Sequence, residues 1–263
     1  MRFSVFTKPW KDLPAAELFK KVAAWGFDGI EFPLRAGFQV EPQNAETELP
    51  AFADEAAEHG LQIMSVASAT DAHIFAACHA AGVPLIRIMA GIDLEKGYLQ
   101  SERDFKTYLN RLLPLCERYG VKVGVQNHFG PMVFSTMELR HLLEDFDPKY
   151  VGAVWDAAHS GLAGEIAAQA LDIIWEKLLL VNLKNAYWKP TNGPEAPKTQ
   201  WAPHFTLGRF GMASYPDIIN YLARNHYNGD ICMPAEFSDD QLAEALVPVE
   251  LAYVKDLFSL AGK

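Results

Sequence analysis

The stretch that decides the fold is VGAVWDAAHS, Val151–Ser160. Its first half is a short apolar run, and Asp156 and His159 then follow among small residues. An acid and an imidazole three positions apart, where a buried strand should end, favour chemistry over packing. Apolar runs end in polar residues in the same way at VKVGVQNH (Val121–His128), LLLVNLKN (Leu178–Asn185) and ICMPAEF (Ile231–Phe237). Polar residues gathered at the same end of several buried strands are typical of a β/α barrel.

Glycines mark the joins between helices and strands. The segments AEHG, HAAG and ERYG each precede an apolar run, at Leu61–Val66, Val83–Ile88 and Val121–Val125. A helix that ends on a glycine and is followed at once by a strand is typical of βα units. Their repetition predicts a parallel sheet that is buried on both faces.

The number of units predicts a closed barrel. Eight strands are expected to begin near residues 2, 28, 61, 84, 121, 151, 178 and 229, with helices between them and a last helix from about Asp239. Ser101–Asp104 and Ser135–Glu138 have the pattern of helix capping boxes. This is the size of a single-domain (β/α)8 TIM barrel spanning residues 1–263. A doubly wound open sheet is the alternative, but TKPWKD after the first strand is no Gly-rich phosphate loop.

Composition excludes several classes of protein. The net charge of −10 argues against nucleic acid as the main partner. No apolar run approaches the roughly 18 residues of a membrane span, and the N-terminus lacks the pattern of a secretory signal. Cys78, Cys116 and Cys232 have no metal-ligand spacing, so we expect buried, reduced thiols and a cytoplasmic protein.

One connection is unusually long. Nearly thirty residues, AYWKPTNGPEAPKTQWAPHFTLGRFGMAS, separate the seventh strand from the next helix. An irregular loop of this length in a compact domain is usually functional. We expect Tyr187–Ala213 to form a lid over the strand ends, with His204 and Arg209 facing a ligand. A contact in a homo-oligomer is the alternative role.

Together these motifs resemble the xylose isomerase-like TIM barrel superfamily, the sugar phosphate isomerase/epimerase group. The resemblance covers nearly the whole chain and rests on GFDGIEF, QNH (126–128), WDAAH (155–159), VNLKN (181–185), LGR (207–209) and AEF (235–237). It implies one divalent metal, held by a Glu, an Asp, a His and a second Glu from strands five to eight. It also implies proton transfer next to a carbonyl, as in epimerisation, isomerisation and dehydration.

The ligand positions of the resemblance are altered in this chain. They fall on Gln126, Asp156, Asn182 and Glu236, so amides replace the first Glu and the His. Such a set carries a formal charge of −2 and would favour the hard cations Mn²⁺ or Mg²⁺, with Zn²⁺ or Co²⁺ as alternatives. A site without metal is the competing interpretation, and the sequence leaves both open.

The remaining site residues have alternative roles. Glu236, Asp156 and His159 are the catalytic candidates, and the family resemblance implies that His159 contacts substrate, although it could also bind the metal or satisfy a strand-end carbonyl. The substrate-binding candidates are His128, Arg87, Lys184, Glu31, His204, Arg209 and Trp10. Arg87 could instead form an ion pair with Glu31, and Lys184 could point outward.

The predicted function is a sugar isomerase, epimerase or related lyase that moves a proton next to a carbonyl. Its substrate would be a small carbohydrate-like polyol or keto acid. Two alternatives remain: a degenerate barrel that binds a sugar or sugar acid without metal, and a metal-free enzyme in which Glu236 and His159 act as an acid–base pair.

Overall fold

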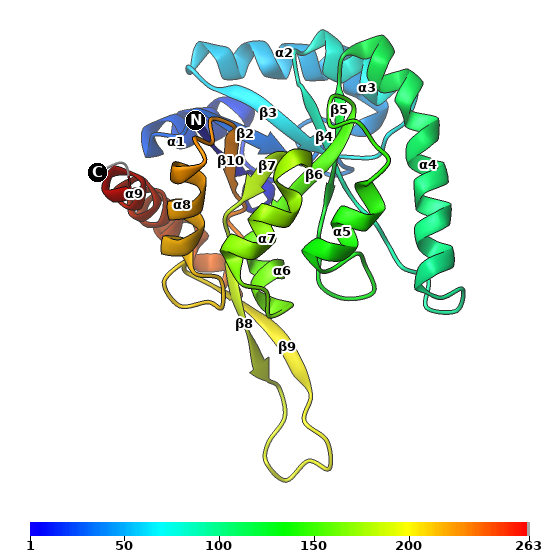
Figure 1. The fold of residues 1–263 in the computed structure, drawn as a ribbon. Coiled ribbons are helices and arrows are strands. Elements are labelled where there is room, and N and C mark those ends of the chain that lie inside the picture. The colour runs from blue at the N-terminus through cyan, green and yellow to red at the C-terminus, as the bar shows by residue number, and fades with distance from the viewer. Residues whose placement is uncertain (262–263) are drawn as a thin grey trace.

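Eight parallel strands close into a barrel in the computed structural model, which describes residues 1–261 (Figure 1). They are β1 (Arg2–Phe6), β2 (Gly29–Phe32), β3 (Gln62–Ala67), β4 (Leu85–Met89), β5 (Lys122–Gln126), β6 (Val151–Asp156), β7 (Leu178–Asn182) and β10 (Asp230–Met233). Their order around the barrel is the order of the sequence, and β10 pairs with both β7 and β1. The predicted (β/α)8 barrel and the eight predicted strand positions are confirmed.

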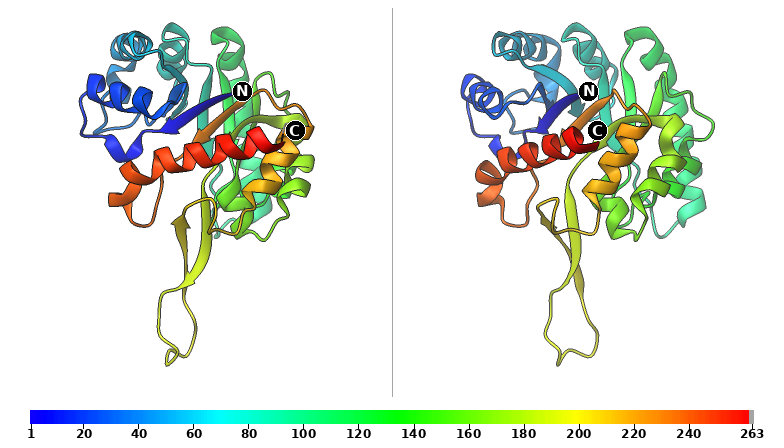
Figure 2. Two further views of the ribbon diagram at one scale, coloured as in Figure 1. Left: turned by 90° about the vertical axis from the view of Figure 1, so that its left-hand side faces the viewer. Right: turned by 60° about the vertical axis from the view of Figure 1, so that its left-hand side comes forward.

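Helices surround the barrel on its outside (Figure 2). They are α1 (Ala15–Trp25), α2 (Ala45–Glu58), α3 (Ala72–Ala80), α4 (Tyr98–Tyr119), α5 (Thr136–Leu143), α6 (Ala157–Leu162), α7 (Ala167–Ile174), α8 (Tyr215–Arg224) and α9 (Ala243–Ala261). Short 3-10 turns cover Lys8–Trp10, Pro42–Asn44, Trp175–Lys177 and Asp240–Leu242. Across residues 1–261, none of the helices combines the length and apolar character needed to span a bilayer.

The predicted helix ends are mostly confirmed. Gly26 caps α1 in the left-handed conformation, and Gly60, Gly82 and Gly120 have positive φ angles where a residue with a Cβ would be strained. The capping box at Ser135 is complete. The predicted box at Ser101 is wrong, because α4 begins earlier and the Ser101 hydroxyl lies inside the helix, where it donates to the carbonyl of Gly97.

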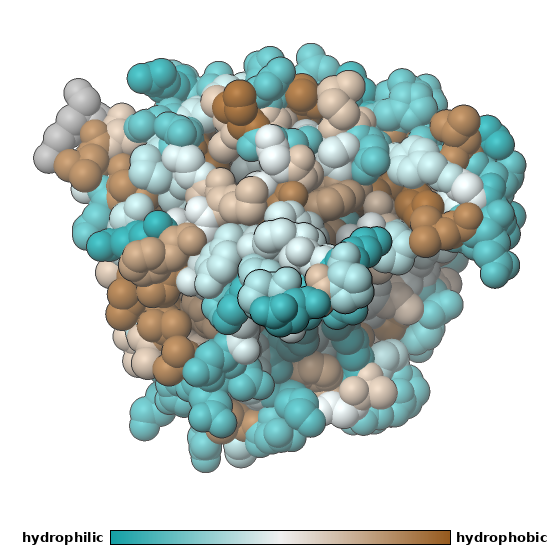
Figure 3. All heavy atoms as spheres, turned by 90° about the horizontal axis from the view of Figure 1, so that it is seen from below, coloured by the Kyte–Doolittle hydropathy of each residue, from teal (hydrophilic) through white to brown (hydrophobic). Residues whose placement is uncertain are grey.

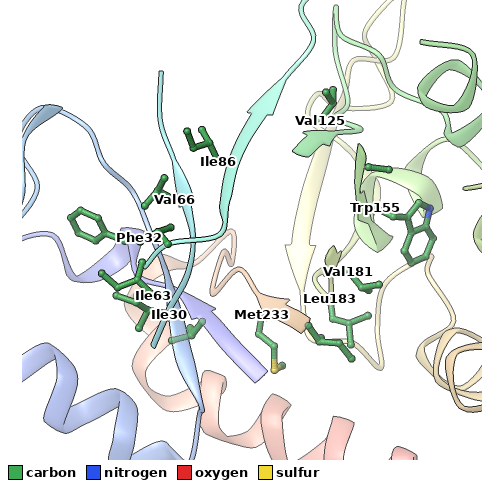
Figure 4. Packing of buried hydrophobic residues seen from close by; sticks show 14 of the residues in the cluster. Ile30, Phe32, Ile63, Val66, Ile86, Val125, Trp155, Val181, Leu183 and Met233 are labelled. Carbon is green, nitrogen blue, oxygen red and sulfur yellow. The ribbon is translucent and has the colours of Figure 1, made fainter. Parts of the chain in front are cut away.

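Alternation along the strands separates two layers of side chains. Residues facing the helices form the main core, which includes Ile86, Val125, Trp155 and Val181 (Figure 4). Their neighbours in sequence fill the interior of the barrel with a much smaller apolar cluster: Phe6, Ala67, Leu85, Val154, Leu180 and Cys232. Because successive side chains point to opposite faces of a strand, Arg87, Asp156 and Asn182 lie two residues beyond this inner cluster and also point inward.

The long connection is a β-hairpin and not an irregular loop, so that expectation was wrong. Strands β8 (Asn185–Pro190) and β9 (Trp201–Thr206) pair antiparallel with Asn185 opposite Thr206. The hairpin projects away from the barrel (Figure 1), and its tip is mostly hydrophilic when seen end-on (Figure 3). Ordered pairing across the two strands satisfies the backbone groups that a loop would leave to water.

The base of the hairpin is fixed by Asn185. Its side-chain nitrogen donates to the carbonyls of Gly208 and Ala213 at 2.8 and 2.7 Å, and its oxygen accepts from the amides of Ala186 and Ala213, both at 3.0 Å. A carboxylate could make only the last two bonds. The amide at this position therefore has a structural role.

Candidate active site

A polar cavity lies at the carboxyl ends of the barrel strands. It has a volume of about 110 Å³ and is lined by Phe6, Lys8, Arg35, Arg87, Met89, Gln126, His128, Asn182, Lys184, Pro234 and Glu236. A wider outer pocket of about 590 Å³ shares Lys8, His128, Lys184 and Glu236 with it. Phe38, Phe129, Phe205 and Phe237 add an apolar wall to this outer part. The arrangement suits a ligand with a polar end inside and an apolar face outside.

A row of side chains with alternating charge runs through the site. Arg87 Nε donates to Glu31 Oε1 at 2.6 Å, and Arg87 Nη1 donates to Gln126 Oε1 at 2.5 Å. Gln126 Nε2 donates to Asp156 Oδ2 at 2.6 Å, and Lys184 Nζ lies 3.5 Å from that same oxygen. The row thus joins the ends of β2, β4, β5 and β6 to Lys184, the second residue after β7.

Glu236 completes this row. Lys184 Nζ donates to Glu236 Oε2 at 2.8 Å, and Lys8 Nζ donates to Glu236 Oε1 at 2.9 Å. Glu236 follows Ala235, which has a left-handed φ of 53°. This conformation is strained for a residue with a Cβ, and it turns the chain sharply just after β10. Backbone strain next to a functional carboxylate is common at active sites.

Gln126 is suited to its position because it is an amide. Its oxygen accepts from Arg87 while its nitrogen donates to Asp156. A glutamate there could still accept from Arg87, but it would place a second carboxylate against the buried Asp156, and like charges at that distance repel strongly. The departure from the family pattern thus follows from the hydrogen bonds around it.

Lys184 and Glu236 are held in their charged forms. Burial alone would lower the pKa of Lys184, but Asp156 and Glu236 outweigh burial and keep this pKa above its ordinary value. Burial would raise the pKa of Glu236, and the ammonium groups of Lys184 and Lys8 instead hold it well below its usual range. The cavity therefore contains a fixed cation next to a fixed anion.

Asp156 and His159 lie behind the cavity wall. Both side chains are fully buried, and Asp156 Oδ1 accepts from the backbone amide of His159 as the N-cap of α6. Burial raises the pKa of Asp156, with Lys184 opposing this effect. Burial, reinforced by Lys184, lowers the pKa of His159 well below its ordinary value. Within residues 1–261, neither ring nitrogen of His159 has a hydrogen-bond partner.

Three of the predicted substrate-binding residues line the cavity. They are His128, Arg87 and Lys184. Lys184 points inward, which settles the direction left open by the sequence. Arg87 lines the cavity, and it also forms the ion pair with the fully buried Glu31 that was its alternative role. Glu31 also accepts from Ser65, so its role in the structure is to hold Arg87.

Three other predicted residues have different contacts. Trp10 is buried against Trp25, with ring centroids 5.1 Å apart, and belongs to the main core. His204 lies on β9 against Tyr187, and the exposed Arg209 lies over the ring of Tyr253 at 4.1 Å. Contact with a ligand in the cavity is therefore not supported for Trp10, His204 or Arg209.

Sequence reasoning missed the cations Lys8 and Arg35 in the cavity and Phe205 in the outer pocket. Lys8 follows β1 and Arg35 lies three residues after β2. Their position just after a strand was the available signal, since all strands of the barrel end on the same side. Phe205, from the base of the hairpin, packs near His159 and Phe129 with ring centroids 6.2 Å from each. Its approach depends on the hairpin, which the sequence did not predict.

Comparison with models of known protein families identifies the family of this chain. The model of the xylose isomerase-like TIM barrel family matches residues 19–257, most of the chain. The chain belongs to the xylose isomerase-like TIM barrel family.

The curated relatives of this chain include several inosose dehydratases. An inosose dehydratase of Mesomycoplasma hyopneumoniae (strain 7448) is 26% identical over 159 residues, which cover 57% of this chain and 53% of that protein. The chain spans about half the length of the curated relatives it matches.

Two solved structures share the fold of this xylose isomerase-like barrel. D-psicose 3-epimerase from Clostridium cellulolyticum H10, solved with D-tagatose, has a TM-score of 0.75 at 14% identity and covers 98% of this chain and 99% of its own. A xylose isomerase-like TIM barrel protein from Mycobacterium smegmatis in complex with magnesium has a TM-score of 0.72 at 15% identity, with coverage of 100% and 98%.

The four ligand positions do not fit the divalent metal that membership of this family implies. Gln126 Oε1 is occupied by Arg87, and both carboxylates, Asp156 and Glu236, already face Lys184. Of the oxygens these positions offer, Asn182 Oδ1 is buried and has no partner among the described residues. Over the same residues, no cluster of three or more His, Cys, Asp or Glu side chains could hold an ion. A neutral amide oxygen alone is a poor ligand set.

Proposed function

We propose that this protein is an enzyme that moves a proton on the carbon next to a carbonyl group of a small polyhydroxylated compound. The reaction class is isomerase, epimerase or dehydratase-type lyase. The observation that carries the proposal is the pair of Glu236 Oε2 and Lys184 Nζ, 2.8 Å apart on the wall of the cavity. Such chemistry needs a base for the proton and a positive group for the oxygen.

The two residues divide the reaction between them. The Glu236 carboxylate takes the proton from the carbon, and the electron pair of that C–H bond becomes the double bond of an enolate. The carbonyl electron pair moves onto oxygen, which accepts a hydrogen bond from the Lys184 ammonium. As Lys184 turns toward this oxygen, Glu236 loses a partner that lowers its pKa and becomes a stronger base. Isomerisation results when the proton is delivered to the former carbonyl carbon while the proton of the neighbouring hydroxyl passes to the enolate oxygen. Epimerisation results when a proton returns to the original carbon on its opposite face. Dehydration results when the hydroxyl of the next carbon leaves and takes the proton held by Glu236, so that water is released.

The rest of the cavity favours a polar ligand. Asn182 Oδ1 could accept a hydrogen bond from a ligand hydroxyl. A buried acceptor without a hydrogen-bond partner costs free energy, and such a ligand would remove that cost. Lys8, Arg35 and Arg87 place positive charge on the wall. Polyhydroxylated keto compounds are therefore favoured, and those with an acidic group gain a further attraction.

Exchange with solvent deuterium tests the proposal. Purified protein in D₂O is incubated with neutral ketoses, inososes and sugar-derived keto acids, and NMR follows loss of the proton next to the carbonyl. A substrate should exchange with the wild type, and Glu236→Gln should slow exchange at least about a thousandfold, within the range reported for loss of a general base. The exposed Glu58→Gln is the matched control and should retain the wild-type rate.

A second candidate function is a barrel that binds a sugar acid without catalysis. The observation that favours it is the replacement of two family ligands by Gln126 and Asn182. A compound that raises the melting temperature of the wild type but shows no exchange would support binding alone and would exclude the enzymatic proposal for that ligand.

A further inference from the structure

We infer that the ammonium group of Lys184 takes the place of the divalent cation in this barrel. Its catalytic half rests on the proposed function, since Lys184 would then stabilise the enolate oxygen that a metal would otherwise face. Its metal-binding half rests on geometry alone. Lys184 Nζ lies 2.8 Å from Glu236 Oε2 and 3.5 Å from Asp156 Oδ2. These are the two family ligand positions that still carry a carboxylate.

The direction of Lys184 follows from the register of the strand. Leu180 belongs to the cluster inside the barrel and Leu183 to the core outside it. Asn182 and Lys184 both line the cavity. The buried stem of Lys184 keeps its ammonium group inside the site, because the side chain is only 6% exposed and the nitrogen lies over the ring of Phe205 at 5.1 Å. A metal entering the site would therefore have to displace a held cation.

The charges around the site are already balanced. Three carboxylates, Glu31, Asp156 and Glu236, face three cations, which are Arg87, Lys184 and Lys8. Arg35 adds a further positive group to the cavity wall. An isolated set of Gln126, Asp156, Asn182 and Glu236 would carry −2, but the complete site presents no net negative charge to an incoming dication. Binding of a divalent ion thus loses its main source of affinity.

The two amides fit this arrangement. Gln126 connects Arg87 to Asp156 through an acceptor and a donor, which a metal-binding glutamate could not do. Asn182 is neutral at a position where an imidazole could become protonated and repel Lys184. The two amides leave Lys184 as the partner of both carboxylates, and restoring the ligands while Lys184 stays between Asp156 and Glu236 should not restore metal binding.

Manganese titration of four proteins tests the inference without using activity. They are the wild type, Q126E/N182H, Q126E/N182H/K184M and Q126E/N182H/K8M, each titrated with Mn²⁺ by calorimetry after dialysis against chelator. Only the Lys184→Met triple variant should bind tightly, at least about a hundredfold better than the double variant, because a buried ammonium within a few ångströms repels a dication strongly. The Lys8→Met triple variant is the matched control, since it removes the other lysine of Glu236 and keeps Lys184. It should gain far less affinity than the Lys184→Met triple variant, because half of the Lys8 side chain is exposed and water and salt screen its charge.

Two results of these titrations would overturn the inference. One is tight Mn²⁺ binding by the wild type, with Kd below about 10 μM, a strength that a held ammonium should prevent. The other is equal affinity of the double variant and the Lys184→Met triple variant.

If the triple variant does not fold, the single variant Lys184→Met tests the inference by itself. Its two carboxylates would lack their shared cation, so millimolar Mn²⁺ should raise its melting temperature and leave that of the wild type unchanged. An unchanged melting temperature in Lys184→Met would refute the inference. Failure of the deuterium-exchange test, by contrast, would remove the proposed reaction and leave these titrations interpretable.

Discussion

Removal of Arg87 should strongly destabilise the barrel, because it leaves a buried charge without its partner. The side chain of Glu31 is fully buried and that of Arg87 is 7% exposed, and their atoms approach to 2.6 Å. In Arg87→Met the remaining contacts of Glu31 are with Ser65 and Cys232. Breaking a buried pair on one side costs about 3–5 kcal/mol. The lost bond to Gln126, which leaves a buried carbonyl oxygen unpaired, places the expected cost at the upper end of that range.

Equilibrium unfolding in urea, followed by circular dichroism, measures this cost. A loss of this size corresponds to a fall in melting temperature of roughly 10 °C for a chain of this length. Arg2→Met is the matched control: its pair with Asp230 is on the surface and should be worth at most about 1 kcal/mol. In E31Q/R87M both charges are gone, so this double variant should recover at least about 2 kcal/mol relative to Arg87→Met. The reasoning is refuted if Arg87→Met costs no more than Arg2→Met, or if the double variant is no more stable than Arg87→Met.

Three further predictions concern the hairpin and the buried histidine. Asn185→Asp should cost about 2–4 kcal/mol in urea unfolding, because two donated bonds are lost and a carboxylate then faces two carbonyls; a variant as stable as the wild type would contradict the bracing role. The pKa of His159 is lowered in the folded state, so the unfolded chain binds this proton first and stability should fall as the pH drops below about 6.5. The fall between pH 7 and 5 should be smaller in His159→Gln than in the wild type, and equal falls would show that His159 does not contribute. Finally, a ligand in the cavity should slow hydrogen exchange around Phe205 and leave residues 191–200 unchanged, since the base of the hairpin lines the outer pocket while its tip projects away. Exchange that stays unchanged around Phe205 would exclude any covering role for the hairpin.

The fold could be predicted because its signals are local. A glycine such as Gly120 ends a helix in a conformation that other residues adopt at a cost, and the apolar run that follows marks the next strand. Each strand start was therefore placed to within a residue or so. The hairpin was missed because its pairing depends on contacts between two strands, such as that of Tyr187 with His204. No local sequence pattern predicts these contacts.

The candidate site was predictable in its positions and less so in its contacts. Strand ends identified Gln126, Asp156 and Glu236, which the structure joins through one row of hydrogen bonds and ion pairs. The sequence placed Asp156 and His159 in the catalytic set, but their complete burial puts them behind the residues that line the cavity. How deep a side chain lies depends on the neighbouring strands, and this information is not contained in any one motif.

The direction of Lys184 could have been predicted, and it changes the interpretation of the whole site. In a strand that continues from Leu180 with period two, Asn182 and Lys184 share one face, and the structure extends that alternation two residues beyond the end of β7. Once the lysine points inward, two carboxylates at family metal positions need no metal to balance them, and an amide at Gln126 becomes the better partner for Asp156. The altered ligands are then one consistent set of changes around a built-in cation. The fully buried Asp156 and the partly buried Glu236 would be costly if they were unpaired, because unpaired buried carboxylates are among the most destabilising groups in a protein. Here each of them is paired, and the shared partner is the group that a carbonyl substrate would meet.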